Sequence, residues 1–214
     1  MERMRSIDPA HPDATLMARA AELLRSGKLV AYPTETFYGL GADPRSIEAV
    51  ERVFEAKGRP DRMALPLIAA DEAAVLLCVR EFPDAARRLA AAFWPGPLTL
   101  VLIASSDLPP RLLGGGHTVG VRISPHPIAS ALARATGGPI VATSANRSGL
   151  PAPSTAVEVD EALGDGVALI LDGGPTTGGI ASTVLDLTAD PPRAVRSGAI
   201  PVAAVEKVLG RRLS

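Results

Sequence analysis

Several positively charged side chains stand beside residues that shape the backbone, a pattern typical of sites for anions. Lys57 and Arg59 are two residues apart, and Pro60 favours an extended backbone that would hold Arg59 toward a loop site. A helix end with a solvated charge pair is the simpler interpretation. Arg122 lies in a strand-like segment, 119–123, where a covered charge needs either an anionic ligand or an ion-pair partner. The residues alone leave both alternatives open.

Hydroxyl and amide side chains form a second polar group. Ser144 and Asn146 directly follow a short strand predicted over 140–142, and with the backbone they offer several hydrogen-bond donors. A plain turn stabilised by these side chains is the alternative interpretation. Loops at strand ends are also where α/β proteins usually bind ligands. We therefore expect function to lie in the loops.

The common motifs for nucleotide, metal and hydrolytic sites are missing from the sequence. There is no G-x-x-x-x-G-K-[ST] loop, and the G-L-G at 39–41 is not completed to G-x-G-x-x-G, which argues against a Walker ATPase or a Rossmann dehydrogenase. His11, His117 and His126 lie far apart, without carboxylate or cysteine companions at metal spacing. No G-x-S-x-G elbow accompanies a serine. We expect neither protein metal ligands nor a catalytic triad.

The elements that would position these residues are strands mixed with helices. Several strands follow one another without a helix between, which predicts an α/β (α+β) fold with a large mixed sheet flanked by helices. No repeat or linker divides the chain, so we expect a single domain over residues 1–214. The segment 34–41 is expected to be a loop. The predicted strands are 29–32, 65–70, 98–104, 118–123, 140–142, 168–171, 183–187 and 194–196, and the predicted helices lie between Asp13 and Gly27, between Ser46 and Gly58, and over 71–79, 83–93, 128–135, 157–163 and 201–209.

The amino-acid composition is typical of a folded globular protein. Its 214 residues are 47% hydrophobic and 21% charged, which supports a buried core and excludes general disorder. The formal net charge is −1, so any site for a polyanion must be local. Cys78 is the only cysteine, which excludes an intrachain disulfide and a cysteine-rich metal site. Because the N-terminus lacks a signal core and no apolar run is long enough to span a membrane, we expect a cytoplasmic protein with no membrane partner.

Seven segments occur in one order along the chain and extend over nearly all of it. They are 32–42 (YPTETFYGLGA), 57–60 (KGRP), 94–99 (WPGPLT), 119–123 (VGVRI), 143–149 (TSANRSG), 182–186 (STVLD) and 196–200 (RSGAI). Taken together, these segments resemble the YrdC/Sua5 family, in which they stand in the same order. The resembling core covers roughly residues 13–210.

The resemblance implies a twisted mixed sheet with a positively charged concave face, and the activity of the short, single-domain L-threonylcarbamoyladenylate synthases. In that reaction the amine of L-threonine captures bicarbonate or CO₂ as a carbamate. The carbamate attacks the α-phosphate of ATP and gives threonylcarbamoyl-AMP and pyrophosphate, and a transferase then moves the group to adenosine 37 of certain tRNAs. The implied ligands are ATP with Mg²⁺, L-threonine and bicarbonate, with no organic cofactor. The implied partner is the tRNA-modifying transferase machinery.

The resemblance also implies roles for individual residues. Lys57 and Arg59 are the implied catalytic groups, facing the phosphates and the carbamate. Thr36, Arg122 and Ser182 are the implied contacts of L-threonine, and the planar fork of Arg122 suits a carboxylate. The implied contacts of ATP are Arg59, Thr118, Ser144, Asn146 and Arg196.

This sequence departs from the long family members in two respects. Many of them have N-P-L-x-x-H after K-x-R-P, with the histidine at the threonine site, whereas this chain has Ile68 there. We interpret Ile68 as a variation in substrate contacts, since some short members also lack the histidine. We expect no second C-terminal domain of the kind that long members have.

Two other functions stay open beside the synthase. One is a non-catalytic RNA-binding or ribosome-associated module for tRNA or double-stranded RNA. The near-zero net charge disfavours it, and the aromatic content of 3% also does, because few aromatic side chains are left on which bases could stack. The other is carbamoyl transfer, which related domains perform within larger enzymes.

Overall fold

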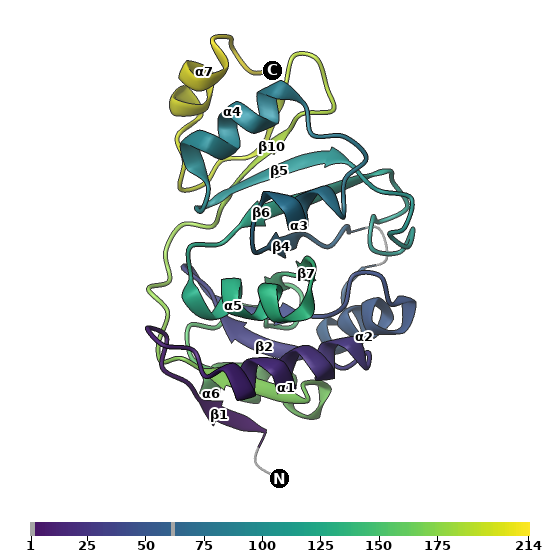
Figure 1. Ribbon diagram of the computed structural model, residues 1–214, viewed down its shortest axis with the longest axis vertical. Coiled ribbons are helices and arrows are strands. Elements are labelled where there is room, and N and C mark those ends of the chain that lie inside the picture. The colour runs from purple at the N-terminus through teal and green to yellow at the C-terminus, as the bar shows by residue number, and fades with distance from the viewer. Residues whose placement is uncertain (1–2, 61–62) are drawn as a thin grey trace.

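The strands of the protein form two mixed β-sheets with helices packed against them (Figure 1). The computed structural model describes residues 3–60 and 63–214. Both sheets contain parallel and antiparallel pairs, which confirms the mixed α/β class, although the sequence predicted one large sheet and the structure has two. In spatial order the first sheet is β1 (Met4–Ser6), β9 (Leu169–Asp172), β2 (Val30–Pro33), β3 (Tyr38–Gly41) and β8 (Thr143–Ser144), and the second is β11 (Arg193–Arg196), β10 (Thr183–Asp186), β5 (Leu98–Ile103), β6 (Thr118–Ile123), β4 (Leu67–Ala69) and β7 (Ile140–Val141).

The helices begin and end at the residues that the sequence marks. The side chain of Asp13 accepts a hydrogen bond from the Leu16 amide at 2.7 Å, and Ser46 caps the second helix in the same way. Gly58 ends that helix in the left-handed conformation, with φ of 55°. In the described part of the chain, none of the helices has the length and apolar character to cross a membrane. The helices are α1 (Ala14–Arg25), α2 (Ile47–Lys57), α3 (Glu72–Leu76), α4 (Asp84–Phe93), α5 (Pro127–Thr136), α6 (Ala156–Leu163) and α7 (Val202–Leu209), with a 3-10 turn at Gly164–Gly166.

Helix α5 connects the two sheets through the hydrophobic core. It packs against α1, against β2 of the first sheet and against β4 of the second, and Figure 1 shows it between the upper and lower halves of the molecule. Ile128 and Leu132 of α5 are buried with Tyr32 of β2 and Ile68 of β4. The two sheets are therefore held in one body by a shared apolar cluster. At the other end of the molecule α4 and α7 pack together over the second sheet.

The chain crosses between the sheets at three places, and the first crossing runs from β3 through α2 to β4. Strand β7 pairs with β4 in the second sheet, and after Ala142 alone the chain continues as β8, which pairs with β3 in the first sheet. The backbone amide of Ala142 donates to the carbonyl of Pro66 at 2.9 Å. Residues 173–182 make the third crossing, from β9 to β10.

Strand β3 corrects the prediction that 34–41 is a loop. Its glycines disfavour a strand in isolation. In the structure they leave room for the ring of Tyr32, because a Cβ added at Gly41 would lie 2.9 Å from that ring and one added at Gly39 would lie 3.2 Å from it. Tyr32 is fully buried, so its ring fills the space that side chains would otherwise take. Packing across the pair β2–β3 thus overrides local propensity.

We expect the Gly41→Ala variant to lose about 1–3 kcal/mol of unfolding free energy, because the new methyl group would overlap the Tyr32 ring and the carbonyl of Val30. Urea denaturation measures this loss. Gly166→Ala is the matched control, since its added Cβ meets only Ala56 at 3.4 Å, an ordinary contact distance. Equal stability of the two variants would contradict the packing account of β3.

Candidate functional site

A cleft of about 550 Å³ lies between the two sheets, and we name it the central cleft. The first sheet contributes residues of β3 and β8, and the second contributes residues of β4, β5, β6, β10 and β11. The turn before β3 and the segment after α2 complete its wall. Six of the nine predicted site residues line it, and these are Thr36, Arg59, Arg122, Ser144, Ser182 and Arg196.

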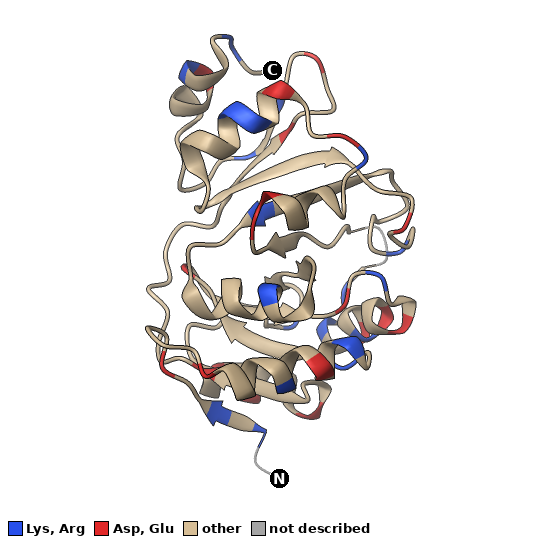
Figure 2. Cartoon of the chain, in the orientation of Figure 1, with Lys and Arg blue, Asp and Glu red and all other residues tan. Residues whose placement is uncertain are grey.

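The cleft is positively charged within a molecule of mixed surface charge. Figure 2 shows both basic and acidic residues on α1 and on α2. Among the described residues that line the cleft, Arg59, Arg122 and Arg196 supply guanidinium groups and no residue supplies a carboxylate. An arrangement of this kind suits a ligand with several negative charges.

Arg122 has an ion-pair partner, Glu35. Of the two alternatives that the sequence left open for this charge, the ion pair is therefore present in the structure. The Nη1 atom of Arg122 donates to Oε1 of Glu35, and the two side chains are only 12% and 16% exposed. The hydroxyl of Ser124 donates to the other carboxylate oxygen at 2.5 Å. Arg122 also lines the cleft, so the ion pair and an anionic ligand are compatible.

Arg59 reaches the cleft from the segment that follows α2. Its Nη2 donates to the carbonyl of Ala64 at 2.9 Å, and its Nη1 lies 3.4 Å from the Thr143 hydroxyl. Burial lowers the pKa of Arg59 from its ordinary value, since the charged form loses hydration. The guanidinium stays charged in the physiological range and is fixed at the wall of the cleft.

Ser182 and Arg196 form one hydrogen-bonded group in the lining of the cleft. The Nε and Nη2 of Arg196 donate to the Ser182 carbonyl at 3.0 and 2.8 Å, and Nη2 also donates to the Ser182 hydroxyl at 3.0 Å. That hydroxyl lies 2.9 Å from Oγ1 of Thr99. Burial, with a smaller contribution from the charge of Arg122, lowers the pKa of Arg196. The guanidiniums of Arg196 and Arg122 thus lie near each other in the cleft. The hydroxyls of Ser182 and Thr99 lie beside Arg196.

The turn before β3 places Thr36 in the cleft. The hydroxyl of Thr34 donates to the Phe37 carbonyl at 2.7 Å and lies 3.3 Å from the hydroxyl of Thr36. Thr34 is buried, so this turn is fixed from within. Thr36 therefore offers a hydroxyl at a defined position, as predicted for a residue that recognises a small polar ligand.

Lys57 supports the site from beneath and does not line the cleft. Its ammonium donates to the carbonyls of Ser144 and Asn146, the latter at 2.7 Å, and lies 3.4 Å from Oδ1 of Asn146. The residue is only 2% exposed. In this structure the Lys57 ammonium contacts the loop after β8, and its predicted contact with phosphates stays a prediction.

The pKa of Lys57 predicts a pH dependence of stability. Burial, with a smaller contribution from Arg59, lowers this pKa to about 8 from the ordinary 10.5. Between these values the unfolded chain holds a proton that the folded protein has released, so the free energy of unfolding rises with pH. We expect the stability difference between wild type and Lys57→Met to grow by about 1–3 kcal/mol as the pH rises from about 8 to about 10. Urea denaturation at several pH values measures this, and a constant difference would contradict it.

Two further predicted ATP contacts lie outside the lining of the cleft. Asn146 is buried, and its amide donates to the carbonyls of Arg147 and Leu150 at 2.9 and 2.6 Å, so it shapes the loop. Thr118 lies at the start of β6, opposite Ile103 of β5. It shares a strand face with Arg122 but lies four residues away, because side chains alternate along a strand.

Sequence reasoning missed Glu35, Ser124 and Thr99 as parts of the site. Glu35 stands in the segment 32–42, but no local signal shows that it faces a residue 87 positions later. Ile68 lies beside Arg122 in the neighbouring strand and is fully buried, so it is a core residue. Strand register places Ile68 beside Arg122, and register is not readable from one sequence. Glu35 lies in the turn between β2 and β3, so its contact with Arg122 depends on the tertiary fold.

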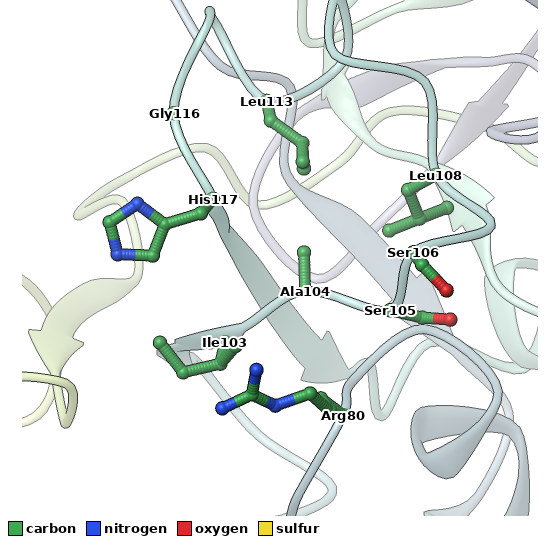
Figure 3. Close-up of a pocket in the computed structure, with 9 residues that line it drawn as sticks. All are labelled: Arg80, Ile103, Ala104, Ser105, Ser106, Leu108, Leu113, Gly116 and His117. Carbon is green, nitrogen blue, oxygen red and sulfur yellow. The ribbon is translucent and has the colours of Figure 1, made fainter.

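A second cavity, of about 640 Å³, lies beyond the ends of β5 and β6 (Figure 3). Much of its lining is apolar, including Ile103, Leu108 and Leu113, and Arg80 is its one arginine among the described lining residues. In Figure 3 the imidazole of His117 points away from the other side chains. None of the nine predicted site residues lines this cavity, so the chemistry is assigned to the central cleft.

Comparisons with known proteins place the chain among proteins of one kind. A family model for Sua5, YciO and YrdC, described as telomere recombination, matches residues 22–198. The chain is 47% identical over 191 residues to a threonylcarbamoyl-AMP synthase of Pyrococcus abyssi and 45% identical over 195 residues to one of Bacillus subtilis. These matches cover 89% and 91% of the chain, and 56% of each relative, so the chain spans little more than half their length. The crystal structure of P. abyssi Sua5 complexed with L-threonine is similar with a TM-score of 0.93 and 43% identity, over 99% of this chain and 62% of that one.

Proposed function

Because the chain belongs to the Sua5/YciO/YrdC family, we propose that it joins L-threonine, bicarbonate and ATP into threonylcarbamoyl-AMP, with release of pyrophosphate. The observation that carries this proposal is the convergence of Arg59, Arg122 and Arg196 on one cleft. Threonine carboxylate, carbamate and triphosphate bring together about six negative charges, which guanidinium groups offset. The name of the relatives and the L-threonine in the similar structure support the same reaction.

The reaction balances without a covalent enzyme intermediate. The neutral amine of threonine forms a C–N bond to bicarbonate and gives a carbamate with loss of water. A carbamate oxygen then forms a bond to the α-phosphorus of ATP, while the bond from that phosphorus to the oxygen bridging to the β-phosphate breaks. Pyrophosphate leaves with that electron pair.

We assign the cleft residues to positioning and charge stabilisation. Arg122 holds the threonine carboxylate, and Thr36 and Ser182 supply hydroxyls for the rest of the amino acid. Arg59 and Arg196 face the phosphates, and Ser144 contacts the nucleotide. Holding carbamate and α-phosphorus in line is worth several kcal/mol of barrier, roughly the range known for well-oriented reactants. Charge stabilisation at the phosphate by fixed guanidiniums adds to this effect.

Mg²⁺ enters this scheme with ATP. Phosphate oxygens and water are the usual ligands of Mg²⁺ in ATP-dependent enzymes, and the ion neutralises phosphate charge there. The described residues contain no group of three or more His, Cys, Asp and Glu side chains that could hold a metal. We propose that a tRNA-modifying transferase in the cytoplasm consumes the product, since a mixed anhydride of a carbamate is an activated acyl donor.

Release of pyrophosphate tests the proposed function. Purified protein is incubated with ATP, Mg²⁺ and bicarbonate, and with L-threonine, L-serine or no amino acid. We expect release that depends on L-threonine and is about tenfold or more slower with L-serine, which lacks one methyl group. Release that is independent of an amino acid, or no release from folded protein, would contradict the proposal. RNA binding that weakens steeply with salt and ignores both substrates would then favour the RNA-binding alternative.

A further inference from the structure

Glu35 contacts Arg122 without being one of the residues that line the central cleft. We infer that Glu35 is a positioning residue for the amino-acid substrate, acting through Arg122, which rests on the proposed function of the cleft. It would set the direction in which the Arg122 guanidinium faces the cleft. The substrates selected in this way are amino acids with a free α-carboxylate.

Both carboxylate oxygens of Glu35 are engaged by the protein. Oε1 accepts from Nη1 of Arg122, and Oε2 accepts from the Ser124 hydroxyl at 2.5 Å. The Ser124 oxygen in turn accepts from the backbone amide of His126 at 3.2 Å. His126 stands at the N-cap position of α5, so these hydrogen bonds connect the carboxylate to the start of a core helix. A carboxylate whose two oxygens each accept a hydrogen bond has little freedom to move.

The backbone around Glu35 is fixed as well. The hydroxyl of Thr177, in the crossing from β9 to β10, donates to the Glu35 carbonyl at 2.9 Å. The Thr34 hydroxyl closes the turn by donating to the carbonyl of Phe37. Glu35 is therefore held on both its main chain and its side chain. A support of this kind lets a charged ligand group keep one geometry before the substrate arrives.

The surroundings of Arg122 provide an electrostatic reason for this support. Arg196 lies close enough that the charge of Arg122 contributes to lowering its pKa. On the same face of the sheet, Ile68 beside Arg122 is fully buried and offers no polar group. The repulsion between two guanidiniums in one cleft is offset by Glu35, which lies outside the lining. Because Nη1 is committed to Glu35, the remainder of the guanidinium fork is the part left to bind a substrate carboxylate.

Three variants separate this role from a merely structural one. Glu35→Gln keeps the size of the side chain and removes its charge, and Glu35→Asp keeps the charge and shortens the reach. Glu158→Gln is the matched control, because Glu158 belongs to the capping box of α6 and does not line the cleft. We expect the KM for L-threonine to rise at least about tenfold in both Glu35 variants, the size of effect that misplacing a binding group produces. The KM for ATP should stay within about twofold of wild type, and Glu158→Gln should change neither KM.

A double-variant cycle and an NMR signal complete the test. In an Arg122→Ala background, Glu35→Gln should not change L-threonine affinity further, because the residue through which it acts is gone. The Nε–H signal of Arg122, identified by its loss in Arg122→Lys, should be sharp in wild type and broadened in Glu35→Gln. Equal changes of both KM values, or an unchanged KM for L-threonine with a sharp Arg122 signal, would overturn the inference. If wild type itself neither binds L-threonine nor forms product, the proposed function fails, while the NMR signal still reports on the contact.

Discussion

Replacing Arg122 with alanine is expected to lower the free energy of unfolding by about 3 kcal/mol and to lower the rate of threonylcarbamoyl-AMP formation at least about a hundredfold. The stability loss arises because Glu35 would keep a nearly buried carboxylate without its cationic partner. The loss of activity arises because the carboxylate of L-threonine would lose the guanidinium that we propose holds it. Urea denaturation and a product assay at saturating ATP measure the two effects.

A second variant separates the two effects. Adding Glu35→Ala to Arg122→Ala removes the unpaired charge and should recover about half of the lost stability, since replacing both members of a buried pair costs less than breaking it. Activity should remain as low as in the single variant. Full activity in a stable Arg122→Ala protein would show that Arg122 does not bind the substrate.

The Lys57→Met variant is expected to lose about 2 kcal/mol of unfolding free energy at pH 7 and to form product at least about tenfold more slowly. Methionine fills similar space but leaves the carbonyls of Ser144 and Asn146 without their buried donor. The loop that carries Ser144 into the cleft would then lose its fixed position. Urea denaturation measures the stability, and the KM for ATP should rise together with the loss of rate.

Lys28→Met is the control for Lys57→Met, because Lys28 is an exposed lysine outside the cleft. Its stability and its activity should match wild type within error. If Lys57→Met behaved like Lys28→Met, the ammonium would have no role in holding the loop. If it lost activity with no change in stability or in the KM for ATP, a direct catalytic role would be favoured instead.

Local signals predicted most elements of the fold. Caps at Asp13 and Ser46 and the glycine at position 58 set helix ends that the structure reproduces. A continuous apolar run predicted β5, and the strand-like segment 118–123 predicted β6, both within one residue of their bounds. These features depend on residues close in sequence, so a single chain is enough to read them.

The division into two sheets was not predictable from local pattern. It depends on Ala142, where the chain passes from one sheet to the other with a single residue between two-residue strands. Short strands such as β8 have too few residues to show alternation. Strand β3 was missed because its glycines are explained only by the ring of Tyr32 in the neighbouring strand.

Most of the residues that the sequence predicted for the site line the cleft, but the sequence did not predict how the site residues are arranged around it. The motif positions Thr36, Arg59, Arg122, Ser144, Ser182 and Arg196 do converge on one cleft. Lys57, at the end of α2, and Asn146, in the loop after β8, instead support that loop from within the core. A lysine beside an arginine has the same appearance in sequence whether it faces a ligand or a carbonyl, because the distinction depends on burial.

The central claim is that one cleft links the carbon of bicarbonate, the nitrogen of threonine and the α-phosphate of ATP. Mass spectrometry of the product formed from ¹³C-bicarbonate, L-threonine and ATP tests this claim most directly. The account predicts a single molecule that contains threonine, AMP and the labelled carbon, and that is absent when threonine is omitted. A threonine–AMP adduct without the labelled carbon would contradict it, because the carboxylate of threonine would then be the attacking group.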